Sequence, residues 1–354
     1  MQSLEGKVAV VAGATRGAGR GIACMLGEAG ATVYCTGRSV RGAPSPINRP
    51  ETIEKTAEMV TAYGGVGIWA QVDHAQPDQV RALFERVRQE QNGRLDVLVN
   101  DMTGDAYIDF DHPFWKHSLE DGLMAHKNGI LSHVITSHYG AQLMVERRQG
   151  LIVEVTDGNG LGYNGNLYYS LNKNSAILLA YFMSVELQEH NVAVVAITPG
   201  YLRSEAMLES KGLTEENWQD GIEEDPIWAD SEAPFYVGRA VAALAADPKV
   251  MDKTGRALSS GWLARDYGFT DVDGKLPPGY YPKEGVFDPL RRGFALEAPG
   301  LSPLERLTNN ELRELAREME IPGADHASTL ELLEALKGID PMRLENKISG
   351  RFVQ

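Results

Sequence analysis

Short apolar segments alternate with amphipathic segments over most of the chain. The apolar segments are rich in valine and isoleucine and end at glycine or polar residues, a pattern typical of strands buried on both faces. We predict strands at 7–12, 32–35, 66–72, 95–99, 151–156, 192–198 and 256–259. Apolar residues at helical spacing predict helices at 78–91, 119–148 and 234–246, and from Tyr168 onward. The alternation predicts an α/β fold with a doubly wound parallel sheet.

A glycine-rich turn follows the first predicted strand. Gly13, Gly17 and Gly19 are spaced G-x-x-x-G-x-G, with Thr15 and Arg16 between them, and a helical pattern follows. Glycines let the backbone approach a ligand, and a helix start presents unpaired N–H groups to an anion. The turn therefore predicts a phosphate cradle for a nucleotide, with a purely structural turn as the alternative.

The end of the second predicted strand bears on which nucleotide would fit. Sites selective for NAD place Asp or Glu there to hold the ribose hydroxyl, whereas an arginine accommodates the 2'-phosphate of NADP. The strand ends in Thr36, Gly37 and Arg38 with no acid. Arg38 and Arg16 therefore favour NADP(H), unless both are solvated surface arginines.

Two further strand ends carry polar residues. Asp73 follows the third strand as an acceptor for the adenine amino group, and Asn100 ends the fourth strand. Ligands of open α/β sheets bind at the carboxyl ends of the strands. We therefore expect both residues beside the nucleotide.

Tyr169 and Lys173 are spaced one helical turn apart. This places an ammonium beside a phenol, which lowers the pKa of the phenol and suits it to proton transfer. The spacing also occurs in many helices by chance, so its meaning depends on the rest of the chain.

The order of these motifs resembles the short-chain dehydrogenase/reductase family over about residues 5–275. The residues that carry the resemblance are Gly13, Gly17, Gly19, Asp73, 95–100, Gly104, 151–153, Tyr169, Lys173, Pro199 and Gly200. The resemblance implies a Rossmann fold and hydride transfer between a nicotinamide and a carbonyl or alcohol, with Tyr169 as acid and base. It also implies that Lys173 holds the nicotinamide ribose, that Pro199 and Gly200 border the cofactor, and that Ser204 lies near its amide or phosphate.

The substrate end departs from the family pattern. Asp157 stands where the family has a serine, and His126 where it has an asparagine in the long helix. The family's Asn-Asn-Ala-Gly turn is replaced by the sequence at 100–104.

Asp157 restricts the chemistry, because an ionised carboxylate only accepts hydrogen bonds and repels a developing alkoxide. Four interpretations are open. Asp157 stays protonated and donates; Thr156 supplies the hydroxyl; the substrate is a cation such as an iminium; or Asp157 caps the turn that follows it.

His126 also has two interpretations. It relays protons to Lys173 and Tyr169 near neutral pH, or it is an ordinary packed histidine. With His133 and His138 it lacks the i, i+4 pairing of a helical zinc site, so we predict no metal.

The segment 201–230 is long and acidic, as in a substrate lid. Its apolar residues are candidates to line a substrate pocket or to pack against the sheet. They are Tyr201, Leu202, Met207, Leu208, Trp218 and Trp228.

Composition narrows the class of protein. The net charge of -15 over 354 residues argues against binding to a nucleic-acid backbone. Cys24 and Cys35 lack metal-ligand spacing, which predicts buried reduced thiols. The start of the chain lacks the pattern of a signal peptide, and no run has membrane-spanning length, so we expect a cytoplasmic protein without a membrane partner.

The tail differs from the rest of the chain. We predict a domain at 1–275, an extended Pro/Gly-rich arm at 276–303 and a small helical module at 304–340. Thr308 with Glu311 and Ser328 with Glu331 form capping boxes for two helices, and the module resembles Rho N-terminal or SAP-like modules. Residues 304–337 carry eight acids and four bases, which favours docking on protein over nucleic acid.

Taken together, the residues predict an NADPH-dependent oxidoreductase acting on a carbonyl or imine/iminium carbon of a small molecule. The resemblance implies a homo-oligomer. The rewritten serine position leaves two alternatives, a non-redox enzyme such as a cyclase or dehydratase and a catalytically silent binding protein.

Overall fold

The computed structural model describes residues 3–43, 48–158, 160–279, 304, 309–324, 327 and 329–339. The chain divides into two compact units, Met1–Tyr280 and Tyr281–Gln354. Each unit is described by itself.

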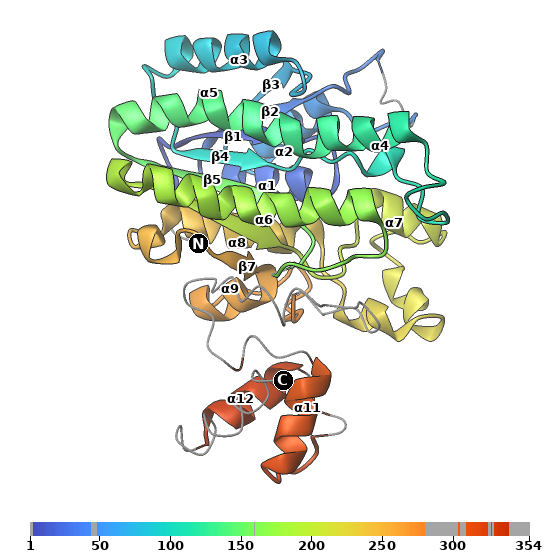
Figure 1. Cartoon of the computed structure of the whole chain (residues 1–354). Coiled ribbons are helices and arrows are strands. Elements are labelled where there is room, and N and C mark those ends of the chain that lie inside the picture. Colours follow the sequence, from blue (N-terminus) through green and yellow to red (C-terminus); the bar gives the residue numbers. More distant parts are fainter. Residues whose placement is uncertain are drawn as a thin grey trace. The chain divides into compact units, whose positions relative to one another are not determined.

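Seven parallel strands form one sheet in the first unit, in the order β3-β2-β1-β4-β5-β6-β7 (Figure 1). Their bounds are β1 Val8–Ala12, β2 Thr32–Gly37, β3 Val66–Gln71, β4 Val97–Asn100, β5 Gly150–Val155, β6 Val192–Thr198 and β7 Ala257–Ser259. The predicted doubly wound sheet is confirmed. The strand order reverses at β1, which pairs with both β2 and β4, and ligands of such sheets bind at this switch point.

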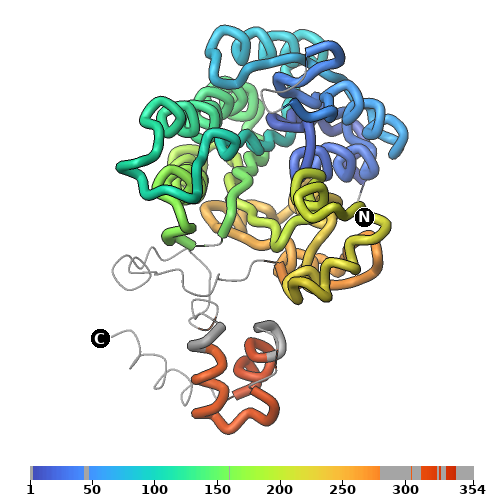
Figure 2. The backbone as a smooth tube through the Cα atoms, turned by 90° about the vertical axis from the view of Figure 1, so that its right-hand side faces the viewer, coloured from blue at the N-terminus to red at the C-terminus, as the bar shows by residue number. Residues whose placement is uncertain are grey.

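Helices cover both faces of the sheet. The α-helices of the first unit are α1 Gly17–Glu28, α2 Ile53–Ala62, α3 Pro77–Glu90, α4 Leu119–His126, α5 Ser132–Arg147, α6 Leu167–Leu187, α7 Glu205–Ser210, α8 Pro234–Ala246 and α9 Ser260–Tyr267. Figure 2 shows the helices α1 and α2, in dark blue, on the opposite side of the sheet from α5 and α6, in green.

The apolar core is split into two layers by the sheet. Ala9 and Val11 of β1 pack in one layer with residues of α1, α2 and α8. Val8 and Val10 pack in the other layer with residues of α3, α5 and α6. Because successive side chains of a strand point to opposite faces, a strand covered on both sides reads as a continuous apolar run.

The long predicted helix at 119–148 is interrupted. A π-helical turn at Lys127–Leu131 separates α4 from α5. Within it, Asn128 Nδ2 donates to the carbonyl of Met124 at 2.9 Å and Ser132 Oγ donates to the carbonyl of Asn128 at 2.7 Å. The apolar periodicity does not reveal this turn, because one extra residue shifts the pattern only slightly.

Three helices were not predicted from the sequence. They are α2, α7 and α9. Gly261, two residues after the predicted last strand, lies in α9, and the segment 201–230 contains α7 and two short 3₁₀ turns. Short helices of this kind take their stability from tertiary packing rather than from local periodicity.

The described residues of the second unit form two helices, α11 Asn309–Glu318 and α12 Thr329–Lys337. They share a core of their own, formed by Leu304, Leu312, Leu315, Ala316, Met319, Ala324, Leu332 and Leu336. The two predicted helices are confirmed. The capping residues Thr308 and Ser328 and the arm at 280–303 lie outside the described residues, and the predicted domain limits stay predictions.

The described parts of the chain add two observations that concern the class of protein. None of their helices combines the length and the apolar character needed to cross a bilayer. Cys24 and Cys35 are both buried, unpaired thiols.

Candidate active site

Tyr169 and Lys173 lie in the first two turns of α6. The helix begins after Asn166, whose side-chain oxygen accepts the N–H groups of Tyr168 and Tyr169 at 2.8 and 3.2 Å, as an N-cap residue does. Lys173 Nζ lies 5.0 Å from the centre of the Tyr169 ring. The predicted ammonium and phenol are therefore neighbours.

Asp157 faces the phenol. It follows β5, and its Oδ2 accepts a hydrogen bond from the Tyr169 hydroxyl at 2.8 Å. The hydroxyl of the preceding Thr156 donates instead to the carbonyl oxygen of Lys173 at 2.7 Å. Of the two residues at this strand end, Asp157 is the one whose side chain meets Tyr169.

Lys173 is surrounded by carboxylates. Its Nζ donates to Asp105 Oδ2 at 3.3 Å. Burial lowers the pKa of Lys173, but Asp105, Asp157 and Asp101 together outweigh burial, so its pKa lies above the ordinary value. The ammonium form is the stable one, and it holds the loop after β4 against α6.

Asp101 connects this cluster to the glycine turn. Its Oδ2 accepts the backbone N–H of Gly19 at 2.6 Å. Burial raises the pKa of Asp101 to about 7, against the opposing influence of Lys173 and of the Gly19 hydrogen bond. No role was predicted for Asp101 or Asp105, although Asp101 directly follows β4 and Asp105 begins the 3₁₀ turn in the same loop.

The glycine turn is as tight as its sequence predicts. Gly13 has a φ of +92°, and a Cβ there would lie 2.4 Å from the carbonyl oxygen of Asp101. A Cβ at Gly19 would lie 2.4 Å from the carbonyl oxygen of Gly13. Thr15, in the same turn, lies against the end of β2, where a Cβ on Gly37 would meet its Oγ1 at 2.8 Å.

A carboxylate from the segment after β6 already uses this turn. The N–H of Gly17 donates to Glu205 Oε2 at 2.8 Å, and Arg20 Nη1 donates to Glu205 Oε1 at 2.9 Å. Backbone N–H groups that bind carboxylate oxygens at a helix start also suit phosphate oxygens. The turn therefore has the chemistry that a dinucleotide pyrophosphate requires.

The two arginines expected at the ribose phosphate have different partners. Arg16 Nε donates to Glu51 Oε2 at 3.2 Å, and its Nη2 is buried without a hydrogen-bond partner among the described residues. Arg38 Nη1 donates to Asn128 Oδ1 at 3.1 Å. A buried guanidinium nitrogen without a partner suits an anion.

Asn100 belongs to a buried polar network. Its Nδ2 donates to Ser137 Oγ at 2.8 Å and to Glu154 Oε1 at 2.7 Å. Glu154 Oε2 lies 2.5 Å from His133 Nδ1, and His133 Nε2 lies 2.8 Å from the carbonyl oxygen of Met102. Burial lowers the pKa of His133, but Glu154 outweighs it and raises the pKa overall. Glu154 was overlooked, although a lone acid in an apolar strand is a recognisable signal.

His126 makes its contact beside Lys173. Its Nδ1 lies 2.6 Å from Asn172 Oδ1, and its ring packs edge-on against Tyr168 with centroids 5.6 Å apart. The hydrogen bond goes to the residue before Lys173 rather than to its ammonium. A proton relay through His126 stays a prediction.

The remaining predicted cofactor residues have local partners. Asp73 Oδ1 accepts the N–H of Ala75 at 3.0 Å. Gly200, after Pro199, donates its N–H to Glu232 Oε2 at 2.9 Å. Ser204 Oγ caps α7 by accepting the N–H of Met207 at 3.3 Å.

Residues 201–230, the segment predicted to be a substrate lid and called the lid segment below, bury their tryptophans in a small apolar cluster. Trp218 and Trp228 are 5 and 1 % exposed and share a small apolar cluster with Leu208. The guanidinium of Arg203 lies 4.2 Å from the centre of the Trp218 ring and bonds Glu215. The two tryptophans thus form a core for this segment rather than the wall of an open pocket.

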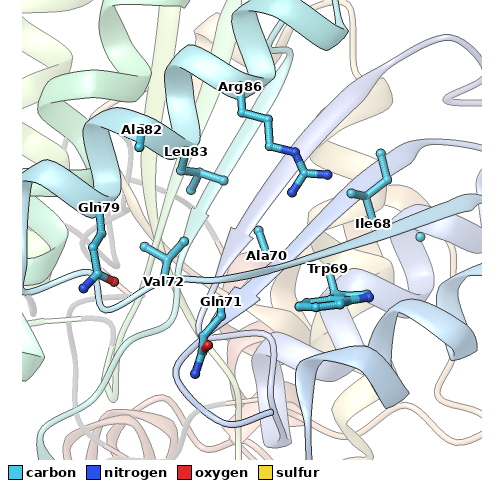
Figure 3. Close-up of a pocket in the computed structure, with 10 residues that line it drawn as sticks. Ile68, Trp69, Ala70, Gln71, Val72, Gln79, Ala82, Leu83 and Arg86 are labelled. Carbon is cyan, nitrogen blue, oxygen red and sulfur yellow. The ribbon is translucent and has the colours of Figure 1, made fainter. Parts of the chain in front are cut away.

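A separate groove of about 730 Å³ runs along the edge strand β3 and α3. Figure 3 shows Leu83 and Arg86 of α3 beside Ile68, Trp69 and Ala70 of β3. Its lining includes none of the predicted site residues. The groove is therefore distinct from the Tyr169 site.

Comparison with known proteins decides the family. Residues 7–215 match the short chain dehydrogenase family. The chain belongs to this family. Its members are oxidoreductases that use nicotinamide cofactors and act on small molecules, which places the Tyr169 and Lys173 pair in an oxidoreductase scaffold.

Curated relatives of this chain are also named as dehydrogenases or reductases. The chain is 36% identical over 285 residues to dehydrogenase/reductase SDR family member 1 of Mus musculus, covering 78% of this chain and 87% of the relative. It is 29% identical over 225 residues to the 3-oxoacyl-[acyl-carrier-protein] reductase FabG of Aquifex aeolicus, covering 63% and 84%.

Solved structures show the same fold. A putative dehydrogenase from Xanthomonas campestris matches with a TM-score of 0.65 at 20% identity, over 81% of this chain and 100% of that structure. A hydroxysteroid dehydrogenase from Escherichia coli matches with a TM-score of 0.59 at 23% identity, over 72% and 96%.

Proposed function

We propose that this short-chain dehydrogenase/reductase is an NADPH-dependent oxidoreductase that transfers a hydride to a carbonyl or imine/iminium carbon of a small organic substrate. The observation that carries the proposal is the group of three side chains at the start of α6. The Tyr169 hydroxyl is bonded to Asp157 at 2.8 Å, and the Lys173 ammonium lies 5.0 Å from the Tyr169 ring.

Tyr169 acts as the acid and base of the reaction. The raised pKa of Lys173 keeps its ammonium charged, despite burial, through Asp105, Asp157 and Asp101. A charged ammonium stabilises phenolate and so supports proton transfer from the Tyr169 hydroxyl to a substrate heteroatom. Lys173 also holds the nicotinamide ribose, as the family resemblance implies.

The bound nicotinamide supplies the hydride, and the glycine turn fits such a cofactor. Gly13 and Gly19 leave no room for a Cβ, and the N–H groups of Gly17 and Gly19 already bind carboxylate oxygens. Arg16, with a buried Nη2 that lacks a partner among the described residues, supports NADP(H) over NAD. Asp73, Asn100, Gly200 and Ser204 complete the proposed binding surface.

A homo-oligomer is the proposed assembly. Apolar side chains are exposed on neighbouring helical surfaces of α5 and α6. They include Val134 on α5 and Leu171, Phe182 and Val185 on α6. Exposed apolar patches of this kind mark protein interaction surfaces. We place the protein in the cytoplasm, without nucleic-acid or membrane partners.

The silent binding protein is the alternative that a specific observation favours. Asp157 accepts the hydrogen bond of Tyr169 where the family has a serine donor. In this alternative the cofactor binds without turnover. A non-redox cyclase or dehydratase would convert substrate without consuming NADPH.

NADPH oxidation with a panel of ketones, imines and enones tests the proposal. We expect turnover with the wild-type chain, a loss of about a hundredfold or more in kcat for neutral substrates in Tyr169→Phe, and nearly unchanged NADPH affinity. We also expect Arg38→Asp to lower kcat/KM for NADPH more than for NADH. NADPH binding without consumption across the panel would overturn the proposal.

A further inference from the structure

Asp157 makes the site beside the Tyr169 hydroxyl suited to a positively charged group. A serine hydroxyl donates a hydrogen bond to a carbonyl oxygen, whereas a carboxylate oxygen bonded to a phenol O–H has no proton to give. Asp157 Oδ2 lies 2.8 Å from Tyr169 Oη, where the reacting heteroatom of a substrate approaches the phenol. The group beside the phenol oxygen is thus a carboxyl group that accepts a hydrogen bond, where a serine would donate one.

Most of the ionisable groups around Lys173 are carboxyl groups. Among the described residues, the carboxylates of Asp101, Asp105 and Asp157 act together on the single ammonium of Lys173. His133, the other basic group near Asp101, is already paired with Glu154 at 2.5 Å. Three carboxyl groups face one ammonium beside Tyr169, an arrangement that opposes an oxyanion and favours a cation.

An aromatic side chain borders the same point. Phe110 packs edge-on against Tyr169 with ring centroids 5.3 Å apart, and half of its surface is exposed. The loop that carries it is fixed, because Asn166 Nδ2 donates to the carbonyl oxygen of Asp109 at 2.9 Å. Phe110 is therefore an exposed aromatic ring beside the phenol that Asp157 contacts, and aromatic rings attract cations.

We propose that Asp157 binds the cationic nitrogen of an iminium substrate, and that this protein interconverts cyclic or aryl imines and amines rather than ketones and alcohols. The inference rests on the proposed hydride transfer and names its substrate class.

The protons and electrons of imine reduction balance in this assignment. A neutral imine first takes a proton from the Tyr169 hydroxyl, and Lys173 stabilises the phenolate that remains. The iminium carbon then accepts a hydride from the reduced nicotinamide, and the carbon–nitrogen π pair becomes the nitrogen lone pair. The products are a neutral amine and the oxidised nicotinamide, so no alkoxide forms beside the carboxylates. Solvent restores the proton of Tyr169.

A matched pair of substrates tests the assignment in the full-length protein. N-methyl dihydroisoquinolinium carries a fixed positive charge, and tetralone is a neutral bicyclic ketone of similar size. We expect the wild-type chain to consume NADPH with a kcat/KM at least about tenfold higher for the iminium. Tyr169→Phe should retain turnover of this iminium, because the fixed charge removes the need for a proton.

Variants at Asp157 isolate the charge. Asp157→Asn keeps the size of the side chain and should lower kcat/KM for the iminium by about tenfold or more, since a desolvated ion pair is lost. Asp157→Ser should lower iminium turnover and raise tetralone turnover. Equal changes for both substrates, or an iminium rate unaffected by either variant, would overturn the assignment.

A binding measurement separates this inference from the proposed function. Calorimetry with protonated N-methyl tetrahydroisoquinoline and the NADPH-loaded protein should give a Kd about tenfold weaker in Asp157→Asn than in the wild-type chain. If no substrate consumes NADPH but this difference is found, hydride transfer fails and the cation site stands. If ketones are reduced and the amine binds both proteins equally, the cation site fails and the oxidoreductase stands.

Discussion

Asp101, which follows β4, and Gly19, in the first turn of α1, are joined by a 2.6 Å hydrogen bond from the Gly19 N–H to the Asp101 carboxylate. Burial raises the pKa of this carboxyl group to about 7. The glycine turn proposed to bind the cofactor phosphates therefore carries a group that titrates near neutral pH.

The first prediction concerns the pH dependence of cofactor binding. Asp101 loses its proton as pH rises from about 6 to 8, which adds negative charge beside the phosphates, so the Kd for NADPH should rise several-fold. Asp101→Asn keeps an oxygen for the Gly19 N–H and should remove most of this rise. Fluorescence titrations with NADPH at several pH values measure the Kd of both proteins. The same pH slope in both proteins would contradict the prediction.

Asp101 also affects stability with a defined sign. Its folded pKa is raised above the ordinary value of 3.8, so its stabilising contribution is complete below that value and is lost as pH rises through about 7. From pH 5 to pH 8, the free energy of unfolding in urea should decline less in Asp101→Asn than in the wild-type chain.

A second prediction concerns the carboxylate that occupies the turn. Glu205 binds the N–H of Gly17 and the guanidinium of Arg20, so it competes with phosphate oxygens. Glu205→Gln should tighten NADPH binding about threefold to tenfold, because a negative charge near the phosphates is removed. Glu216→Gln is the matched control, since Glu216 is an exposed acid of the same segment. Weaker binding in Glu205→Gln would show that Glu205 supports the turn instead.

The third prediction concerns the contact between α1 and α8. A Cβ on Gly21 would lie 2.0 Å from the carbonyl oxygen of Pro234, which is backbone and cannot move alone. Gly21→Ala should destabilise the protein by about 1–3 kcal/mol or more. Gly162→Ala is the control, because no atom lies within 4 Å of the added Cβ. Equal unfolding midpoints in urea would argue against close packing of these helices.

The fourth prediction concerns the buried pair of His133 and Glu154. Glu154→Gln keeps an acceptor for Asn100 but removes the negative charge that raises the pKa of His133. The variant should lose about 1–3 kcal/mol of stability near pH 6. Because a raised histidine pKa stabilises the protein below its ordinary value and the effect is lost at higher pH, the difference should shrink as pH rises above 7.

A control and a direct readout accompany this variant. Glu186→Gln removes an exposed acid of α6 and should leave stability within about 0.5 kcal/mol. The imidazole resonances of His133, followed by NMR, should titrate at lower pH in Glu154→Gln than in the wild-type chain. An unchanged titration would show that Glu154 is not the cause of the raised pKa.

The local signals of the chain were predictable because they depend on near neighbours. The glycine turn follows a buried strand, and its steric demand at Gly13 appears in the sequence as a missing side chain. Tyr169 and Lys173 are one helical turn apart, so their proximity follows from helix geometry alone. The parallel sheet was also predictable, because apolar strands joined by helices have few alternative arrangements in an α/β fold.

Other parts of the site depend on residues that are distant in the chain. Asp101 meets Gly19 and Glu205 meets Gly17 only after the strands have paired in their order. Whether Asp157 or Thr156 faces Tyr169 depends on the exact end of β5, because successive side chains of a strand point to opposite faces. Trp218 and Trp228 were candidates either to line a substrate pocket or to pack in the core, and the structure buries both in a small apolar cluster with Leu208.

The sequence by itself determined the fold class, the glycine turn and the tyrosine–lysine pair, because backbone preference and helical or strand spacing act over a few residues. Only the tertiary structure decided which carboxylates surround Lys173, which of them occupies the glycine turn, and that Asp157 rather than Thr156 meets Tyr169. Those contacts join strand ends and loops that are far apart in the chain, and their position is set by how the sheet and helices pack. The grouping of carboxyl groups around Tyr169 and Lys173 is therefore a property of the fold.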